Sequence, residues 1–459
     1  MQNPEGVLQA LRRITVCDPA CGSGAYLLGM LQELLQLRAS LFTARNVDTR
    51  SVYDRKLEII QNNIYGVDID PFAVNIAQLR LWLSLIVDFH IGHQGDEPPT
   101  LPNLDYKIEA GDSVLGPDPS GASPSEFDRL LVEQYVHAKA AYLTSHGDDK
   151  KRLHDEVEEL QASIRTWARR GVGGQGFDWA IEFAEVFDDG GFDVVVANPP
   201  YVRQELIKDI KPALKNVYGD VYSGTADLYT YFYARAVQML RTGGMLAFIS
   251  SNKWFRANYG ANLRRYLAKQ YDVWSITDFG ELPVFQTAAT FPMIFVARKD
   301  QQDRTPTVFT QVKSLSEPYP DVAALIDQAG QQLPADAIKG DIWTLTNAAA
   351  AQRLRRMEQA GVPLGEYVKG KLFRGVLTGF NTAFVVNGET RAALIAQDLK
   401  SAEIIKPLAI GDDGIRSGGG NEYWRRGAGP MSAHGICEKR QDRTLLLLTG
   451  GGHGQDALH

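Results

Sequence analysis

The stretch Asp193-Val-Val-Val-Ala-Asn-Pro-Pro-Tyr201 decides the fold prediction for this chain of 459 residues. Asp193 to Ala197 is a short, mainly apolar run rich in β-branched valine, which is typical of a buried parallel strand. Pro199 and Pro200 cannot continue a strand ladder, so the chain must leave the sheet there. The segment that follows the strand is therefore expected at the carboxyl edge of an α/β sheet, where ligands bind.

The Asn-Pro-Pro-Tyr segment also suits one particular chemistry. A planar amino group conjugated to a ring or a carbonyl is a poor nucleophile because its lone pair is delocalised. The Asn198 amide oxygen and the Pro199 carbonyl oxygen can accept hydrogen bonds from the two N–H groups of such an amine, which favours a pyramidal, nucleophilic nitrogen. Tyr201 offers a flat face on which a base can stack. The alternative interpretation is a strand that ends in a Pro-rich turn without further role.

Composition and charge narrow the class of protein. A hydrophobic content of 44% and a charged content of 22% are ordinary for a soluble globular protein. The net charge of −7 argues against a protein that coats nucleic acid non-specifically, although it leaves room for a local basic cleft. The sequence begins without a signal peptide, and its apolar runs are too short to span a bilayer. These features predict a cytoplasmic protein without a membrane partner.

No metal site is expected from the cysteines and histidines. The three cysteines are too few and too unevenly spaced for a disulfide framework or a zinc site; they are Cys17, Cys21 and Cys437. His90 and His93 have the spacing of possible metal ligands, but no further ligands accompany them. We interpret Cys17 and Cys21 as small packing residues and the histidines as part of a solvated loop.

A glycine turn forms the second motif, Asp18-Pro-Ala-Cys-Gly-Ser-Gly24. It follows a predicted strand at Ile14–Val16 and precedes a predicted helix over Ala25–Phe42, as in the first unit of a dinucleotide-type site. Gly22 and Gly24 let the backbone approach a ligand, and the helix N-terminus directs free N–H groups toward it. The turn lacks the phosphate-binding lysine of a P-loop, so a different ligand is indicated.

Three aspartates follow predicted strands. Asp68 ends a strand and is placed to accept hydrogen bonds from ribose hydroxyls. Asp70 precedes Pro71 and is expected to cap the next helix. Asp112 follows the strand Tyr106–Glu109 and is a candidate acceptor for an adenine amino group; a plain turn aspartate is the alternative.

The remaining pattern predicts the domain boundaries. Residues 117–176 form an expected insertion, a Pro/Gly/Ser linker followed by a helical hairpin. After Tyr201, a basic loop could close over nucleic acid, with a solvated surface loop as the alternative; its cations are Arg203, Lys208, Lys211 and Lys215. The last strands of the sheet are expected at Val273–Asp278 and Pro292–Ala297. We therefore predict a catalytic domain at 1–300, a connector at 301–360 and a further domain at 361–459. The expected helix of the connector runs over Asp341–Gly361.

In this order the motifs resemble the adenine-N6 DNA methyltransferases, specifically the Taq-type and type IIG restriction–modification group. The resemblance covers residues 14–300 most closely and 360–415 more loosely. The cofactor loop comes first, the catalytic motif next and the recognition domain last, which is the γ arrangement of that family. It implies a Rossmann-like S-adenosylmethionine-dependent methyltransferase sheet with a helical insertion. It also implies a partial C-terminal target-recognition domain that opens at Phe373–Asn381.

The resemblance assigns three groups of residues. The cofactor-binding group is Asp18, Ala20, Gly22, Gly24, Asp68, Asp112 and Phe232. The catalytic group is Asn198, Pro199, Pro200 and Tyr201. The group that packs on a flipped target base is Tyr201 and Phe285. Within the first group, Asp68 corresponds to the ribose contact, and Asp112 and Phe232 to the two contacts with the cofactor adenine. Double-stranded DNA is the implied partner, and any restriction nuclease would lie outside this chain.

Two departures from the family pattern lead to a further expectation. Thirteen residues precede Ile14, too few for the helix and loop that usually cover the methionine end of the cofactor. The recognition domain also ends early, so a gene product shortened at both ends is expected.

Two alternative functions remain open from the sequence. A methyltransferase for glutamine side chains or ribosomal RNA would share the catalytic motif, although the region after Gly361 favours DNA. Type I modification subunits are nearer, but they typically read Asn-Pro-Pro-Phe. A catalytically inactive, truncated remnant is the second alternative.

Overall fold

The computed structural model describes most of the chain. The described residues are 4–41, 50–88, 102–121, 126–168, 176–285, 291–300, 306–317, 319–334, 336–345, 352–353, 356–357, 359–362, 364–367, 369, 385–386, 388–407 and 444–446. The chain divides into two compact units, Met1–Gln359 and Ala360–His459, and each is described by itself.

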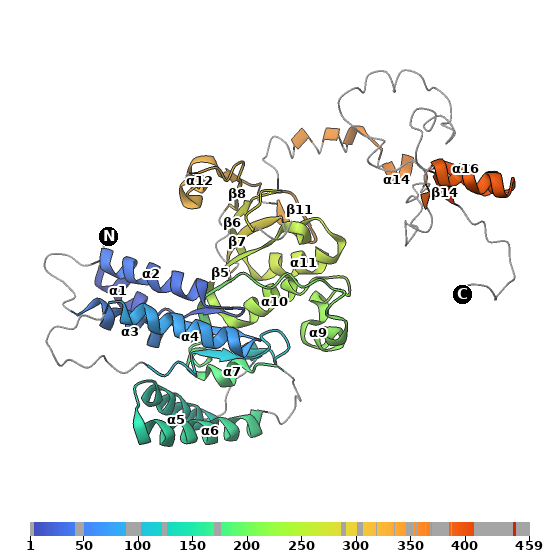
Figure 1. Ribbon diagram of the computed structural model, residues 1–459. Coiled ribbons are helices and arrows are strands. Elements are labelled where there is room, and N and C mark those ends of the chain that lie inside the picture. Colours follow the sequence, from blue (N-terminus) through green and yellow to red (C-terminus); the bar gives the residue numbers. More distant parts are fainter. Residues whose placement is uncertain are drawn as a thin grey trace. The chain divides into compact units, whose positions relative to one another are not determined.

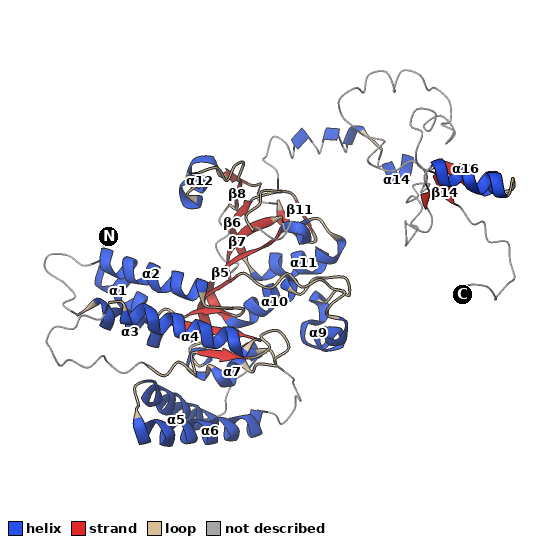
Figure 2. Cartoon of the chain, viewed as in Figure 1, coloured by secondary structure: helices blue, strands red, loops and turns tan. Residues whose placement is uncertain are grey.

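Nine strands form one sheet in the first unit, in the order β3-β2-β1-β4-β5-β7-β6-β8-β9 (Figures 1 and 2). The strands are β1 (Val16–Asp18), β2 (Ile64–Asp68), β3 (Ile108–Ala110), β4 (Phe192–Ala197), β5 (Leu240–Ser251), β6 (Asp272–Asp278), β7 (Pro292–Arg298), β8 (Val308–Gln311) and β9 (Gln331–Gln332). The strands from β3 to β5 pair in parallel, whereas β7 is antiparallel to both of its neighbours. The predicted α/β fold with a Rossmann-like sheet is confirmed, and the sheet is mixed because of β7.

Helices cover both faces of this sheet, as a parallel sheet requires. On one face lie α1 (Pro4–Arg13), α2 (Ala25–Ser40), α3 (Val52–Asn63) and α4 (Pro71–Ile86). On the other lie α7 (Trp179–Glu182), α8 (Ala184–Phe187), α9 (Lys211–Tyr218), α10 (Tyr229–Met239) and α11 (Ala261–Gln270). β4 shows the division directly, because Val194 and Val196 pack in the first core and Val195 and Ala197 in the second.

Local signals start the helices that flank the predicted site. α2 begins after Gly24, whose φ of 79° is the left-handed conformation that suits glycine. α4 begins with Pro71 after Asp70, and the Asp70 carboxylate accepts a hydrogen bond from the Phe72 amide at 2.9 Å. The predicted cap at Asp70 is confirmed.

The predicted insertion is a hairpin of α5 (Glu126–Leu143) and α6 (Gly147–Ala168). Its two helices pack through a small core of their own, which includes Tyr135, Leu153 and Val157. Tyr106 and Ile181 belong to the same core, so the hairpin rests on the segment before β3 and on α7 (Figure 1).

The sheet extends further along the chain than the sequence pattern indicated. Two more strands follow residue 300, because β8 pairs in parallel with β6 and β9 pairs with β8. The predicted connecting helix over Asp341–Gly361 is wrong at its start. There, β11 (Ile342–Trp343) pairs with β10 (Ile338–Lys339), and Trp343 is buried against Trp254. Strands of two to four residues are too short to give a readable alternation.

The basic segment after Tyr201 also differs from the expected loop. It contains α9, which is anchored by the buried side chains of Leu214 and Tyr218. Two apolar anchors among many polar residues are a weak sequence signal, which explains the difference.

The second unit contains α14 (Leu364–Tyr367), α16 (Gly388–Gln397) and α17 (Ser401–Ile404). Its strands β12 (Val385–Val386), β14 (Thr444–Leu446) and β13 (Ile405–Pro407) form a small antiparallel sheet in that order. The predicted opening of a recognition domain, Phe373–Asn381, lies outside the described residues, as do His90, His93 and Cys437. None of the helices in the described ranges has the length and apolar character that a bilayer crossing requires.

Candidate active site

The order of the strands brings the two predicted motifs to one place. From β1 the sheet runs through β2 to β3 on one side and through β4 to β5 on the other, so strand order reverses between β1 and β4. These two strands are paired in parallel, with Cys17 opposite Val195. The loops that leave their carboxyl ends begin at Pro19 and at Asn198. Such a reversal point is where open α/β sheets bind ligands.

The cofactor loop, Asp18–Gly24, contains one charged residue, Asp18. Its exposed fraction is 0%. Its Oδ1 accepts a hydrogen bond from the Ala20 amide at 2.9 Å. Its Oδ2 is buried and has no donor among the described residues. Burial raises the pKa of Asp18 to about 7; the Ala20 amide lowers it, and the charge of Asp68 raises it. An acceptor of this kind suits a donor brought by a ligand.

The two glycines of the loop adopt conformations that require glycine. Gly22 has a φ of 51° and Gly24 a φ of 79°. A Cβ atom at Gly24 would also lie 2.9 Å from the Cβ of Ala77 on α4. Gly24 therefore permits both the turn and the close approach of α4 to the loop.

Asp68 holds the glycine turn from the neighbouring strand. Its Oδ2 accepts from the Gly22 amide at 2.8 Å, and its Oδ1 accepts from the Asp70 amide at 3.0 Å. Each carboxylate oxygen can accept a second hydrogen bond, so the predicted ribose contact stays a prediction. Ile69 and Phe72, which follow Asp68 in the chain, are 71% and 70% exposed.

The loop after β3 carries Asp112. Its Oδ1 accepts from the amides of Val114 and Leu115 at 2.9 and 3.0 Å, and its predicted contact with an adenine amino group stays a prediction. The Ser113 hydroxyl donates to the Pro19 carbonyl at 2.6 Å and so ties this loop to the cofactor loop. Phe232 is 5% exposed and packs in the core, so little of its ring is left for a ligand.

The predicted catalytic segment leaves two polar atoms buried without a partner. The Asn198 Oδ1 atom and the Tyr201 hydroxyl have no hydrogen-bond partner among the described residues. Pro199 is buried and Pro200 is exposed. Burial and the nearby Tyr26 raise the pKa of Tyr201 well above its ordinary value. Tyr26, in the first turn of α2, is a site neighbour that sequence reasoning missed.

The structure brings Tyr201 and Phe285 together, as the sequence predicted for the target-base group. Their ring centroids are 6.2 Å apart with an interplanar angle of 58°. The ring of Tyr229 on α10 also packs against Tyr201, with 5.9 Å between the two ring centroids. The predicted stacking of a flipped base on these rings stays a prediction.

The basic segment contributes fewer free cations than the sequence suggested. Lys211 donates to the Gln204 side chain at 2.6 Å and to the Gly224 carbonyl at 2.7 Å, so it fixes this segment locally. Arg203, Lys208 and Lys215 are exposed. These three remain candidates for contact with a polyanion.

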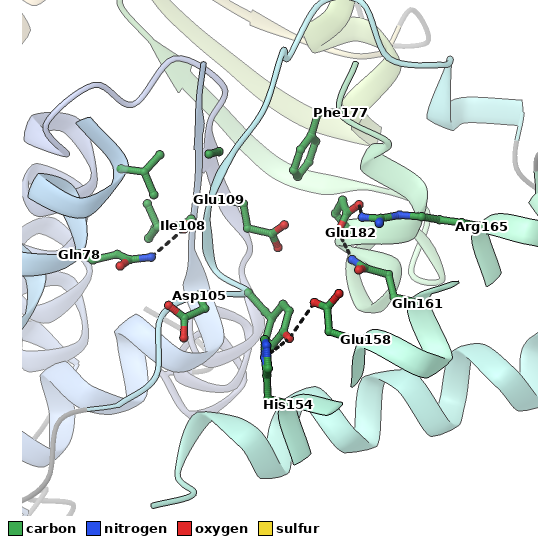
Figure 3. Close-up of a pocket in the computed structure, with 13 residues that line it drawn as sticks. Gln78, Asp105, Ile108, Glu109, His154, Glu158, Gln161, Arg165, Phe177 and Glu182 are labelled. Carbon is green, nitrogen blue, oxygen red and sulfur yellow. Dashed lines mark hydrogen bonds and ion pairs between the residues drawn. The ribbon is translucent and has the colours of Figure 1, made fainter. Parts of the chain in front are cut away.

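A separate polar cavity of about 360 Å³ lies where the helical hairpin meets β3 (Figure 3). Within this cavity Glu182 is bonded to Gln161 and Arg165, whereas the buried Glu109 Oε1 has no hydrogen-bond partner among the described residues. Burial and Glu182 raise the pKa of Glu109 well above its ordinary value. No predicted site residue lines this cavity, so we assign it to the docking of the hairpin. The described part of the chain holds no cluster of three or more His, Cys, Asp or Glu arranged for a metal ion.

Comparison with known proteins bears on these residues. The family described as Eco57I restriction-modification methylase matches residues 62–285. The type II methyltransferase M.PaeR7I of Pseudomonas aeruginosa is 30% identical over 218 residues, which cover 44% of this chain and 36% of that protein. The adenine-specific methyltransferase PglX of Streptomyces coelicolor is 23% identical over 341 residues, which cover 72% of this chain and 23% of that protein.

A solved structure shares the fold. The type IIL restriction-modification enzyme MmeI, in complex with DNA, aligns with a TM-score of 0.52 and 15% identity over 98% of this chain and 47% of that chain. This chain spans between 28% and 36% of the length of three curated relatives. The family match begins after the cofactor loop and includes the later predicted site residues: Asp68, Asp112, Asn198, Pro199, Pro200, Tyr201, Phe232 and Phe285.

Proposed function

We propose that this chain methylates adenine N6 in duplex DNA, because residues 62–285 match the family described as Eco57I restriction-modification methylase. The methyl donor would be S-adenosylmethionine and the target base would be flipped out of the helix. The observation that carries the proposal is the buried Asn198 Oδ1 acceptor, which has no donor among the described residues. It stands at the strand-order reversal beside the glycine turn.

The residues of the cofactor loop fit the proposed methyl donor. S-adenosylmethionine, when bound, supplies an electrophilic methyl group on a sulfonium. Asp18 would accept from the cofactor's ammonium group, for which its buried Oδ2 is free among the described residues. Gly22 and Gly24 would let the backbone approach, and Asp68 would receive the ribose hydroxyls. Asp112 would accept from the adenine amino group through Oδ2.

Asn198 and Pro199 would act on the target amine. The Asn198 Oδ1 atom and the Pro199 carbonyl would accept its two N–H bonds, which favours a pyramidal nitrogen and stabilises the positive charge that develops there. Leaving a buried acceptor unpaired costs about 1–3 kcal/mol, so this oxygen favours a ligand that brings a hydrogen-bond donor. This chain would need no general base, because the amine loses its proton after alkylation. Positioning then supplies most of the rate enhancement.

Tyr201 and Phe285 would hold the flipped base between their rings. Base–aromatic stacking is worth about 1–3 kcal/mol per base. We further propose that the second unit contributes target recognition and that any nuclease of the system lies outside this chain. The proposed methyl transfer to DNA takes place in the cytoplasm.

Transfer of labelled methyl from S-adenosylmethionine to unmethylated bacterial DNA, followed by nucleoside analysis, tests the proposal. N6-methyladenine that disappears with Asn198→Ala is the expected result. Label on a release-factor peptide or ribosomal RNA, with none on DNA, would replace the proposal by the glutamine or RNA alternative. Cofactor binding without transfer to any of the three would indicate a catalytically inactive remnant.

A further inference from the structure

Arg235 is a fully buried arginine on α10, with an exposed fraction of 0%. Its Nη1 donates to the Pro117 carbonyl at 2.7 Å, and its Nη2 donates to the carbonyls of Val114 and Gly116 at 2.9 and 2.5 Å. All three acceptors belong to one short loop, the segment 111–117 that follows β3. A buried charge is costly unless it is well hydrogen-bonded, so this loop and the guanidinium hold each other in place.

The same loop presents Asp112 to the proposed cofactor site. The Asp112 carboxylate is oriented by the amides of Val114 and Leu115. Arg235 binds the carbonyl of Val114, and so does the Tyr218 hydroxyl at 2.8 Å. One of the two peptide units that orient the carboxylate, the unit that joins the Val114 carbonyl to the Leu115 amide, is therefore fixed by the guanidinium.

A second set of contacts closes the loop from the other side. The Phe177 amide donates to the Asp112 carbonyl at 2.9 Å, and the Trp179 indole donates to the Ser113 carbonyl at 3.1 Å. Phe177 is also a wall of the cavity in Figure 3, so it links the end of the insertion to the loop. Arg235 holds the loop from the side of α10, and α10 itself is held in place by packing on the sheet.

We propose that Arg235 is a positioning residue for the adenine end of the cofactor site. The α10 helix carries Phe232 one turn before Arg235, so the guanidinium sets the spacing between Phe232 and the Asp112 loop. This inference rests on the proposed function. Arginine suits the role because its planar fork can bond several carbonyls at once, whereas a lysine offers a single nitrogen.

Arg235→Lys tests the proposal, with Arg38→Lys as the matched control. Arg38 of α2 is also buried, and its Nη2 donates to the Leu11 carbonyl and to Asn63 Oδ1, both at 2.7 Å. It packs beside α1 and α3, away from the loop after β3. Both substitutions remove the fork of a buried arginine, so both are expected to lower the melting temperature. Only Arg235→Lys is expected to change cofactor affinity.

The affinity for S-adenosylhomocysteine, measured by calorimetry on the full chain, gives the readout. Arg235→Lys is expected to raise Kd about tenfold, and the KM for the methyl donor by the same factor, with kcat at saturating donor changed by less than about twofold. 5′-Methylthioadenosine, which lacks the amino-acid group, should lose the same factor. Equal losses in the Arg38→Lys and Arg235→Lys variants, or an unchanged Kd in Arg235→Lys, would overturn the positioning role.

Failure of the proposed function gives a different pattern. If the wild-type chain binds neither ligand, the proposed function falls and this inference falls with it. If the wild type binds and Arg235→Lys binds equally well, the inference alone falls. Amide hydrogen exchange over residues 111–117 without ligand is expected to accelerate in Arg235→Lys and to stay unchanged in Arg38→Lys.

Discussion

The two loops that meet between β1 and β4 satisfy their polar groups in different ways. On the cofactor side, Asp68 and Asp112 each accept two backbone amides, and Ser113 bonds to Pro19. On the target side, the Asn198 Oδ1 atom and the Tyr201 hydroxyl are buried without partners among the described residues. The loops of the first side are therefore held by the protein itself and leave the buried Asp18 Oδ2 for a ligand, whereas the second side leaves both of its buried polar atoms for a ligand.

The largest effect is expected for Asn198→Ala, which would break the target side alone. Removing the acceptor should lower kcat by at least about 10³-fold, because the amine loses a preorganised partner as its charge develops. The Kd for S-adenosylhomocysteine should stay within about twofold of wild type. Methyl transfer and calorimetry on the same preparation measure both quantities. Parallel loss of transfer and of cofactor affinity would contradict the division between the two sides.

Removal of the Tyr201 ring should have the next largest effect. Tyr201→Ala and Phe285→Ala are each expected to lower kcat/KM for DNA by roughly 10- to 100-fold, since each deletes one stacking face for the base. Fluorescence of 2-aminopurine at the target position reports whether the base leaves the helix. Flipping that is unaffected in both variants would remove the two rings from the proposed target pocket.

The pH dependence of cofactor affinity should show a smaller effect. The pKa of Asp18 is about 7, so the carboxyl is largely protonated below that pH and loses the charge that pairs with an ammonium group. Affinity for S-adenosylhomocysteine is therefore expected to rise by about tenfold from pH 6 to pH 8. Asp18→Asn should abolish the pH dependence. The same sensitivity in Asp18→Asn would show that another group is responsible.

The stability of the free protein should change in the opposite sense. The folded pKa of Asp18 lies above the ordinary value of 3.8, so the folded state holds the proton more tightly than the unfolded chain. The contribution of Asp18 to the free energy of unfolding is full below about pH 4 and is lost as pH rises through about 7. Urea denaturation at several pH values, with Asp18→Asn as the reference, isolates this contribution.

Much of the central sheet could be read from the sequence. The valines of β4 and the Asp70–Pro71 pair before α4 are local signals, and both features were confirmed. β8 and β9 could not be predicted, because strands of four and two residues depend on their pairing, β8 with β6 and β9 with β8, rather than on their own pattern. The helix α9 likewise depends on contacts with distant parts of the chain, which its own sequence pattern does not reveal.

The site residues that belong to a local motif could be predicted from the sequence. Contacts between residues that are far apart in the chain could not. Asp18 and Asn198 stand in recognisable motifs, but the burial of their free oxygen atoms follows only from packing. Arg235 is one polar residue in a helical pattern, and its three acceptors lie 118 to 121 residues earlier. No periodicity in a single sequence reports a contact of that separation.

The smallest effects are expected from two hydroxyl deletions, one on each side. Ser113→Ala removes the bond to Pro19 and should lower the free energy of unfolding by about 1 kcal/mol. Tyr201→Phe removes a hydroxyl that has no partner among the described residues, so the free energy of unfolding should stay unchanged or rise slightly. Equilibrium denaturation of the two variants measures the difference. An equal loss in both would mean that the Tyr201 hydroxyl is already satisfied in the free protein, and that the target side is as saturated as the cofactor side.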